Sequence, residues 1–341
     1  MVTPVQRRNA RARARLAAAV RASLSAMGYE EIETPCLVPA PGMEPHLDAF
    51  LAPFRAEVGG PERPLWLATS PEYAMKRLVA DGLGRIFQLA RVFRNGELSP
   101  THNPEFTMLE FYRAGAEYRG VMTDTERLLE GCARALAPDG GARAQRRGQA
   151  IDLSAPYEVV TVQEAFECHA GLDLAACGGD PVQLHAAARA AGHDPGPGGE
   201  GFDDIFFRVM LDAVEPRLGV ERPTWLVDWP ASMAALSRLK PGDPLWAERF
   251  ELYAGGLELA NGFTELTDPA EQRARLVEER TTRAHLGRPL YPLDERFLEA
   301  LGRMPPSAGV AVGFDRVLML LTGAESIEEV LLFPASGFWE G

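Results

Sequence analysis

The sequence has 341 residues, of which 46% are hydrophobic and 24% are charged. These proportions are typical of a folded globular protein and exclude a disordered or fibrous chain. No run of about 18 apolar residues is present, and the first 20 residues lack an apolar signal core, so we expect a cytoplasmic protein with no membrane partner. The net charge of −13 is unfavourable for gripping a phosphate backbone, and we find no basic patch in the sequence that would offset it.

The four cysteines, Cys36, Cys132, Cys168 and Cys177, are far apart and form no CxxC pair. This spacing argues against a zinc site and against a disulfide framework. We therefore expect buried structural thiols.

Helices and strands alternate in the first half of the chain. Leu16, Val20 and Leu24 recur at a four-residue step, which predicts a long amphipathic helix. Ser70 and Pro71 have the residue types of an N-cap and a first helical position. The expected elements are a helix over 6–27, a short strand within 29–42, a strand, a turn and a helix within 64–82, strands over 84–95 and 104–113 joined by a nine-residue loop, and a helix over about 124–136.

Glycine and proline become frequent between residues 138 and 221, where they separate short helices over 181–191 and 203–214. We interpret this segment as a helical insertion in a single catalytic domain that spans residues 1–341. Strands resume within 223–230, 249–266 and 308–313, with a charged helix over 270–285. Antiparallel strands broken by helices predict an α+β fold, in which helices flank an antiparallel sheet.

The strand over 104–113 carries the first chemically informative group. Period-two alternation places four of its side chains on one face, namely Phe106, Met108, Glu110 and Tyr112. A carboxylate among aromatic residues is costly to bury without a partner. The partner of Glu110 is either a structural cation such as Arg113 or a ligand that brings a positive charge. For this hairpin alone, the structural cation is the better interpretation.

A second group favours a ligand. We expect a two-residue turn at Gly255 and Gly256 that pairs Tyr253 with Glu258, so that Glu251 and Glu258 project from one face. Two close carboxylates repel each other unless a cation lies between them. Mg²⁺ bound together with a nucleotide phosphate is the natural candidate. A solvated acidic hairpin is the alternative, and the neighbouring leucines and phenylalanine fit it poorly.

The third group is a small-residue strand that opens into a helix at "GFDR", residues 313–316. Gly313 allows a ligand to approach the backbone, and Arg316 in the first helical turn is well placed to hold a phosphate. Alone this is a weak signal, because such junctions are common. Its weight comes from the order of the three groups.

Three segments, taken in chain order, resemble motifs 1, 2 and 3 of class II aminoacyl-tRNA synthetases. They are "IETP" (Ile32–Pro35), "FRNGE…HNPEF" (Phe93–Phe106) and "GFDR" (Gly313–Arg316). "TSPEYAMKRL", "MLEFYR" and "LELANGFTEL" are similar to the lysyl branch. The motif 1 helix starts almost at residue 6, which leaves no room for the anticodon-binding OB domain of lysyl-tRNA synthetases. The chain thus resembles the elongation factor P lysine ligases, which activate (R)-β-lysine with ATP and transfer it to a lysine of elongation factor P.

The resemblance implies ATP and Mg²⁺ as cofactors, elongation factor P as protein substrate, (R)-β-lysine or lysine as amino acid, and a homodimer built through motif 1. It implies catalytic roles for Arg94, Arg316 and Glu258, and Mg²⁺ binding by Glu251 and Glu258. The ATP site would comprise Arg94, Asn95, Gly96, Glu97, Asn103, Phe106, Glu258, Leu259, Gly313 and Arg316. The amino acid site would comprise Ser70, Pro71, Glu72, Glu110, Tyr112, Asn261, Phe263, Glu265 and Ala311.

Within the resemblance, Gly96 departs from the family pattern, whereas Ala311 matches the elongation factor P ligases and differs from lysyl-tRNA synthetases. Gly96 follows Asn95 where the family usually has Glu, which puts the contact of this loop to the adenine amino group in doubt. Ala311 stands where lysyl-tRNA synthetases tend to have Gly, and its methyl group could favour a β-amino acid by about 1–3 kcal/mol.

Three rival functions remain open from the sequence. The first is a truncated lysyl-tRNA synthetase paralogue that acts on tRNA. The negative net charge makes tRNA a less favoured acceptor than a protein, because it repels the phosphate backbone. The second is an ammonia-dependent asparagine synthetase, which needs a cation where Glu110 and Glu265 stand. The third is a non-catalytic regulatory paralogue, which the retained arginines and acids argue against.

Overall fold

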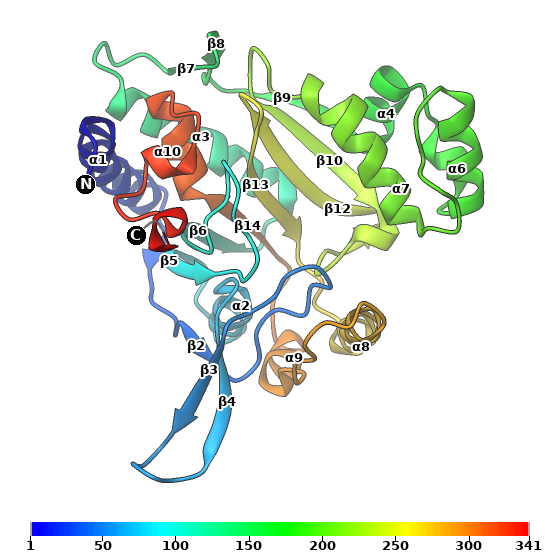
Figure 1. Cartoon of the computed structure of the whole chain (residues 1–341), viewed down its shortest axis with the longest axis horizontal. Helices are drawn as coiled ribbons and strands as arrows, with labels where there is room; N and C mark the ends of the chain where they lie inside the picture. The colour runs from blue at the N-terminus through cyan, green and yellow to red at the C-terminus, as the bar shows by residue number, and fades with distance from the viewer. Residues whose placement is uncertain (1, 340–341) are drawn as a thin grey trace.

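The computed structural model describes residues 2–339, and its central element is a nine-stranded sheet (Figure 1). The strand order is β1-β5-β6-β14-β13-β12-β10-β9, with β11 paired to β12. The pairs β1–β5 and β9–β10 are parallel and the other pairs are antiparallel. The strands are β1 (Glu30–Glu31), β5 (Arg85–Phe93), β6 (Glu105–Ala114), β9 (Glu158–Thr161), β10 (Thr224–Pro230), β11 (Leu239–Lys240), β12 (Asp243–Ala254), β13 (Leu257–Thr264) and β14 (Ser307–Gly313). The expected α+β fold is confirmed.

The register of the central strands aligns one row of residues across the sheet. Glu110 on β6 lies opposite Ala311 on β14, which lies opposite Asn261 on β13, which lies opposite Glu251 on β12. The expected pairing of Tyr253 with Glu258 across the glycine turn is also confirmed. Residues that are far apart in sequence are thus brought side by side.

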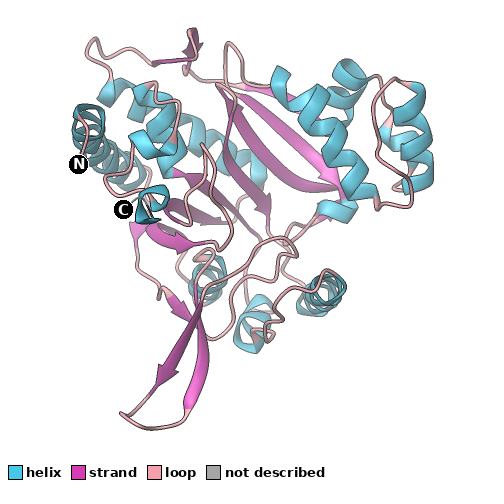
Figure 2. Cartoon of the chain, in the orientation of Figure 1, coloured by secondary structure: helices cyan, strands magenta, loops and turns pink. Residues whose placement is uncertain are grey.

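Helices cover both faces of the sheet (Figure 2). The helices are α1 (Pro4–Ala26), α2 (Glu72–Ala80), α3 (Tyr118–Leu136), α4 (Val162–Ala170), α5 (Leu174–Cys177), α6 (Pro181–Ala190), α7 (Phe202–Val209), α8 (Pro269–His285), α9 (Glu295–Leu301) and α10 (Phe314–Thr322). Leu109 and Phe111 share a core with α1, α3 and α10, whereas Tyr112, next in the chain, shares a core with α2 and α9. Because strand side chains alternate, the two helix groups lie on opposite faces.

Helix α3 begins at Tyr118, six residues before the expected start. The Tyr118 amide donates to Thr264 Oγ1 at 2.9 Å, and its hydroxyl donates to Asp228 at 2.9 Å. These bonds come from distant parts of the chain, so the local sequence around Gly120 did not indicate the first turn.

The expected cap of α2 is shifted by one residue. Pro71 occupies the N-cap position and the helix begins at Glu72. The Ser70 hydroxyl accepts only a long bond of 3.4 Å from the Glu72 amide. Ser70 therefore adds little to the helix end, and its side chain lines the cavity described below.

The segment between residues 138 and 221 contains strands as well as helices, so the expectation of a helical segment is incomplete. A small hairpin of β7 (Arg143–Arg146) and β8 (Gln149–Asp152) precedes β9, which joins the central sheet. The helices α4, α5, α6 and α7 gather at one end of the molecule (Figure 1). Their apolar residues form a separate core with Trp229 and Tyr253 of the sheet.

A second, three-stranded sheet protrudes from the molecule (Figure 1). Its order is β2-β4-β3, formed by β2 (Leu37–Val38), β4 (Glu62–Leu67) and β3 (Leu51–Arg55). The short strand expected within 29–42 is in fact two, because β1 joins the central sheet and β2 joins this one. Leu51 is 60% exposed and Phe54 is 45% exposed.

Two expectations about the surface are wrong. Cys132 and Cys177 are buried, but Cys36 and Cys168 are exposed. Helix α1 also exposes a row of arginines and contains no acidic residue, so a local basic patch exists; it comprises Arg7, Arg8, Arg11 and Arg15. Among the described residues, we find no helix with the length and apolar character needed to cross a membrane.

Candidate active site

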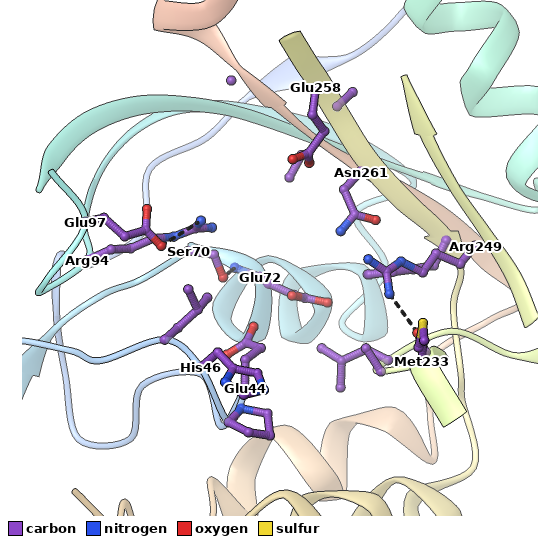
Figure 3. A pocket seen from close by; sticks show the side chains of 18 of the residues that line it. Glu44, His46, Ser70, Glu72, Arg94, Glu97, Met233, Arg249, Glu258 and Asn261 are labelled. Atoms are coloured by element: carbon purple, nitrogen blue, oxygen red, sulfur yellow. Dashed lines mark hydrogen bonds and ion pairs between the residues drawn. The ribbon is translucent and has the colours of Figure 1, made fainter. Parts of the chain in front are cut away.

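A cavity of about 1110 Å³ lies against the sheet face that carries Glu110 (Figure 3). Strands β6, β13 and β14 form one wall, and α2, α8 and the loop over residues 44–47 form others. Pockets for drug-sized ligands are typically about 300–1,000 Å³. This cavity can therefore hold a nucleotide and a second, smaller molecule together.

One end of the cavity is acidic. Glu110 and Glu265 are each 2% exposed, and Glu72 lies beside them on α2. The Tyr112 hydroxyl donates to Glu110 at 2.5 Å. Lys76 Nζ lies 2.5 Å from Glu265 and 2.6 Å from Glu72. Lys76 thus pairs with two of the three carboxylates, and two negative charges stay unbalanced when all three are ionised.

These groups shift one another's protonation. Burial raises the pKa of Glu110 well above its usual range, and the charge of Glu72 adds to this effect. Burial raises the pKa of Glu265 to about 7, against the opposing charge of Lys76. Burial would lower the pKa of Lys76, but the charges of Glu265 and Glu72 outweigh it and raise that pKa. A further cation bound at the acidic end would therefore stabilise the ionised carboxylates.

The structural partner considered for Glu110 is excluded. Arg113 points elsewhere and pairs with Asp124 at 3.0 Å. The expectation that a ligand alone neutralises the buried acids is also wrong in part, because Lys76 already pairs with Glu265 and Glu72. The sequence analysis missed this lysine.

Three buried oxygens at this end have neither a hydrogen-bond partner nor an ion-pair partner within residues 2–339, namely Glu110 Oε2, Glu265 Oε1 and Asn261 Oδ1. Buried polar atoms are usually paired, so each orphan requires an explanation. All three are acceptors, and an ammonium group supplies three donors.

The backbone leaves little room between these groups. A Cβ atom at Gly309 would lie 2.3 Å from the Tyr112 ring and 2.7 Å from Glu265 Oε1. Ala311 places its methyl group between Glu110 and Asn261 in the row across the sheet. Phe263 lies near Lys76, with Nζ 5.9 Å from the ring centroid.

The other end of the cavity is basic, and Arg94 forms one side of it. Its guanidinium lies 5.2 Å from the Phe106 ring centroid and 3.7 Å from Glu97. Asn95 instead bonds through its backbone to Asp48. Gly96 has φ +85°, a conformation that favours glycine, which explains why no glutamate stands at that position.

Arg316 forms the other side of the basic end. It donates to the Glu258 carbonyl at 2.8 Å and lies 3.3 Å from the Glu258 carboxylate. It also donates to His102 Nε2 at 2.6 Å. Burial and the charge of Arg316 lower the pKa of His102, so this ring is neutral and accepts the bond. Asn103 is engaged within the protein, since it bonds Glu105 and Ala335.

The acidic pair on β12 and β13 is already partly compensated, contrary to the sequence argument. Glu251 accepts from Arg249 at 2.6 Å and from the Tyr253 hydroxyl at 2.5 Å. Glu258 faces the cavity beside Arg316. Burial raises the pKa of Glu251 to about 7, and the charge of Glu258 contributes. The described residues contain no cluster of three or more potential metal ligands.

The structure brings most of the expected site residues to one cavity. Its wall includes Ser70, Glu72, Arg94, Glu97, Asn103, Phe106, Glu110, Glu258, Leu259, Asn261, Phe263, Ala311, Gly313 and Arg316. Tyr112, Glu251 and Glu265 are not part of that wall, but they contact Glu110, Arg249 and Lys76, respectively. Pro71, Asn95 and Gly96 do not line the cavity.

Residues 1–337 match the family described as tRNA synthetases class II (D, K and N). A Histophilus somni protein named elongation factor P–(R)-beta-lysine ligase is 39% identical over 327 residues, which cover 95% of this chain and 94% of the relative. The chain belongs to this family of class II synthetase-like ligases. Proteins of the same name from Salmonella paratyphi B and Klebsiella pneumoniae are each 39% identical over 323 residues, which cover 94% of this chain and 93% of the relative.

Membership confirms the family and the enzyme class that the three motifs indicated. Class II synthetase-like ligases use ATP. The cavity has a basic end, which suits the phosphates of a nucleotide, and an acidic end.

The raised pKa values predict a pH dependence of amino acid binding. A bound ammonium favours the charged forms of Glu110 and Glu265, so their pKa values fall on binding and protons are released. Affinity for (R)-β-lysine should therefore increase as pH rises through about 7, the pKa of Glu265. Isothermal titration calorimetry at pH 7 in two buffers with different protonation enthalpies measures the release. Equal heats in both buffers would contradict the expected linkage.

Proposed function

We propose that this protein activates (R)-β-lysine with ATP as an aminoacyl-adenylate and transfers it to the ε-amine of a lysine on elongation factor P. One observation carries the proposal: the cavity has three carboxylates, two of them buried, with one internal cation at one end and Arg94 and Arg316 at the other. A substrate with two ammonium groups complements the first end, and nucleotide phosphates complement the second.

The amino acid is oriented by its charges. Its distal ammonium would bind Glu110 and Glu265 beside Tyr112, and its inner ammonium would bind Glu72 and Ser70. The orphaned Glu110 Oε2 and Glu265 Oε1 are acceptors for such donors. The Ala311 methyl group narrows the floor of the pocket and would favour a β-amino acid over an α-amino acid by about 1–3 kcal/mol.

The nucleotide would occupy the basic end. Arg94 and Arg316 would hold the phosphates, and Phe106 would stack on the adenine. Glu258 fits a Mg²⁺ site, since it faces the cavity, and Glu251 would join it by releasing Arg249. Bound Mg²⁺ would neutralise phosphate charge.

The protein would catalyse the reaction by holding the two substrates in position and stabilising the charge on the phosphates, without a protein nucleophile. The carboxylate of the amino acid attacks the α-phosphorus, and pyrophosphate leaves while Arg94 stabilises the charge. The amine of the acceptor lysine next attacks the acyl carbon, and AMP leaves. An aspartate substrate is disfavoured, because its side-chain carboxylate would face Glu110 and Glu265.

A homodimer is part of the proposal. The protruding β2-β4-β3 sheet exposes Leu51 and Phe54, and apolar side chains on a projecting sheet favour contact with a second copy. We expect gel filtration at micromolar concentration to give twice the monomer mass and Phe54→Glu to shift the protein toward monomer. A monomeric wild-type protein would contradict this expectation. The expected cytoplasmic location belongs to the same proposal.

Action on tRNA is the second candidate, because the basic patch on α1 contains four exposed arginines. The deciding experiment measures AMP formation from ATP with (R)-β-lysine, L-lysine or aspartate, followed by addition of elongation factor P or tRNA. We expect AMP formation with (R)-β-lysine and a mass increase of elongation factor P. Acylated tRNA with unmodified elongation factor P would overturn the proposal in favour of the second candidate.

A further inference from the structure

The proposed transfer step lacks an identified proton acceptor. A free lysine side chain has a pKa of about 10.4 and is an ammonium near neutral pH. Its nitrogen must lose one proton before it can attack the acyl carbon, and a second proton once the amide has formed. A carboxylate near the acyl carbon could take these protons.

Several carboxylates of the cavity have no role in the functions described so far, and two of them are Glu44 and Glu279. Glu44 lies in the loop between β2 and β3, and Glu279 lies on α8; both line the cavity. Glu44 is seen across the cavity from Glu258 and Asn261 (Figure 3). Neither carboxylate forms an ion pair within residues 2–339.

The position of Glu44 is fixed by its surroundings. Arg283, which is fully buried, donates to the carbonyl oxygens of Glu44 at 2.8 Å and Leu47 at 2.7 Å. A Cβ atom at Gly42 would lie 2.2 Å from Glu44 Oε2, so this carboxylate packs against the backbone of its own loop. That oxygen is shielded from solvent and has no hydrogen-bond partner in the described part of the chain.

Glu44 lines the same cavity as Glu72 and Arg94, and the charges of both act on it. The negative charge of Glu72 acts on it from the amino acid end, and the positive charge of Arg94 acts on it from the phosphate end. The bond between the acyl group and the phosphate is made and broken between these two ends. Glu44 thus lines the cavity in which this bond would be made and broken.

The raised pKa values of both carboxylates suit a proton acceptor, because a carboxylate with a higher pKa is a stronger base. Burial, followed by the charge of Glu72, raises the pKa of Glu44. Burial, followed by the charges of Glu44 and Glu72, raises the pKa of Glu279 to about 8. The charged and titratable groups that face the pair are Glu72 and Tyr73 on α2, Arg94 after β5, and Arg275, Glu278 and Arg283 on α8.

We propose that Glu44 and Glu279 receive the ε-ammonium of the acceptor lysine and take its protons during transfer, an inference that rests on the proposed function. One carboxylate takes the first proton, and the free amine attacks the acyl carbon. The new C–N bond forms as the C–O bond to the phosphate breaks, and AMP leaves with the electron pair. The second carboxylate takes the remaining proton from the nitrogen, so charge and atoms balance.

The test separates activation from transfer. ATP–pyrophosphate exchange with (R)-β-lysine measures the first step, and single-turnover modification of elongation factor P by the preformed adenylate measures the second. A positioned base contributes about 10²–10⁴-fold. We expect Glu44→Gln and Glu279→Gln to retain exchange and to slow transfer by about 10²-fold. Glu299→Gln is the matched control, since Glu299 is exposed on α9 and does not line the cavity, and it should transfer normally.

The pH profile of transfer provides a second readout. In the wild-type protein the rate should rise with pH, reach half of its maximum near 8, where half of Glu279 is ionised, and level off above that pH. In Glu279→Gln it should keep rising toward the pKa of the acceptor lysine, about 10.4. Normal transfer in both variants, or a raised KM for (R)-β-lysine in exchange, would overturn the acceptor assignment alone. Absence of exchange in the wild-type protein would overturn it together with the proposed function.

Discussion

Replacement of Glu110 by glutamine should reduce kcat/KM for (R)-β-lysine in ATP–pyrophosphate exchange by about 30- to 3000-fold. Loss of one partner from a buried charged pair costs about 2–5 kcal/mol, and 1.4 kcal/mol corresponds to a factor of ten. The substitution keeps the size of the side chain and its bond from Tyr112, so the lost quantity is the negative charge. Most of the effect should be in KM for the amino acid, because the ammonium is bound before and during the reaction.

The thermal stability of this variant distinguishes a functional acid from a structural one. Glu110 is buried, and burial and the charge of Glu72 disfavour its ionised form. Glu110→Gln should therefore melt at the same temperature as the wild-type protein or higher. Glu105→Gln on the same strand is the control, because Glu105 is exposed and outside the cavity. A stable Glu110→Gln protein with unchanged KM would show that the distal ammonium binds elsewhere.

Replacement of Lys76 by methionine should have the largest effect on stability. Lys76 is 1% exposed and is the internal cation of both Glu72 and Glu265. Removal of one partner from a buried ion pair typically costs about 3–5 kcal/mol, since the other charge stays buried. Urea unfolding at neutral pH should show this loss as a lower midpoint with an unchanged slope.

The direction in which the stability loss of Lys76→Met changes with pH tests whether unpaired buried carboxylates cause that loss. Without Lys76, the remaining carboxylates have their pKa values raised further, so the defect should be largest at alkaline pH and should shrink as they become protonated at lower pH. The double variant with Glu265→Gln should recover part of the loss, because one buried charge is removed with its partner. A Lys76→Met protein that is as stable as the wild type at all pH values would contradict the ion-pair assignment.

Local patterns in the sequence indicated much of the site. Alternation along β6 placed Phe106, Met108 and Glu110 on one face, and the glycine pair set the register of Tyr253 against Glu258. Both inferences depend on geometry within one strand or one tight turn. The three motifs supplied the family, because their order extends over nearly the whole chain.

The compensation of the buried acids could not be inferred in this way. Lys76 lies one helical turn after Glu72, but it meets Glu265 only when α2 packs against the end of β13. His102 becomes a partner of Arg316 through the loop between β5 and β6. These contacts join residues that are more than 150 positions apart in the sequence, and His102 also lies in an irregular loop. No periodic pattern in the sequence predicts such contacts.

The central claim is that the acidic end of the cavity selects an amino acid with a distal ammonium group. The most direct test is ATP–pyrophosphate exchange with (R)-β-lysine and with (R)-3-aminohexanoate, which has the same chain without the distal amine. We predict that kcat/KM is at least about 10²-fold higher for (R)-β-lysine, because the analogue leaves Glu110 and Glu265 unpaired. Equal exchange with the two compounds would contradict the claim.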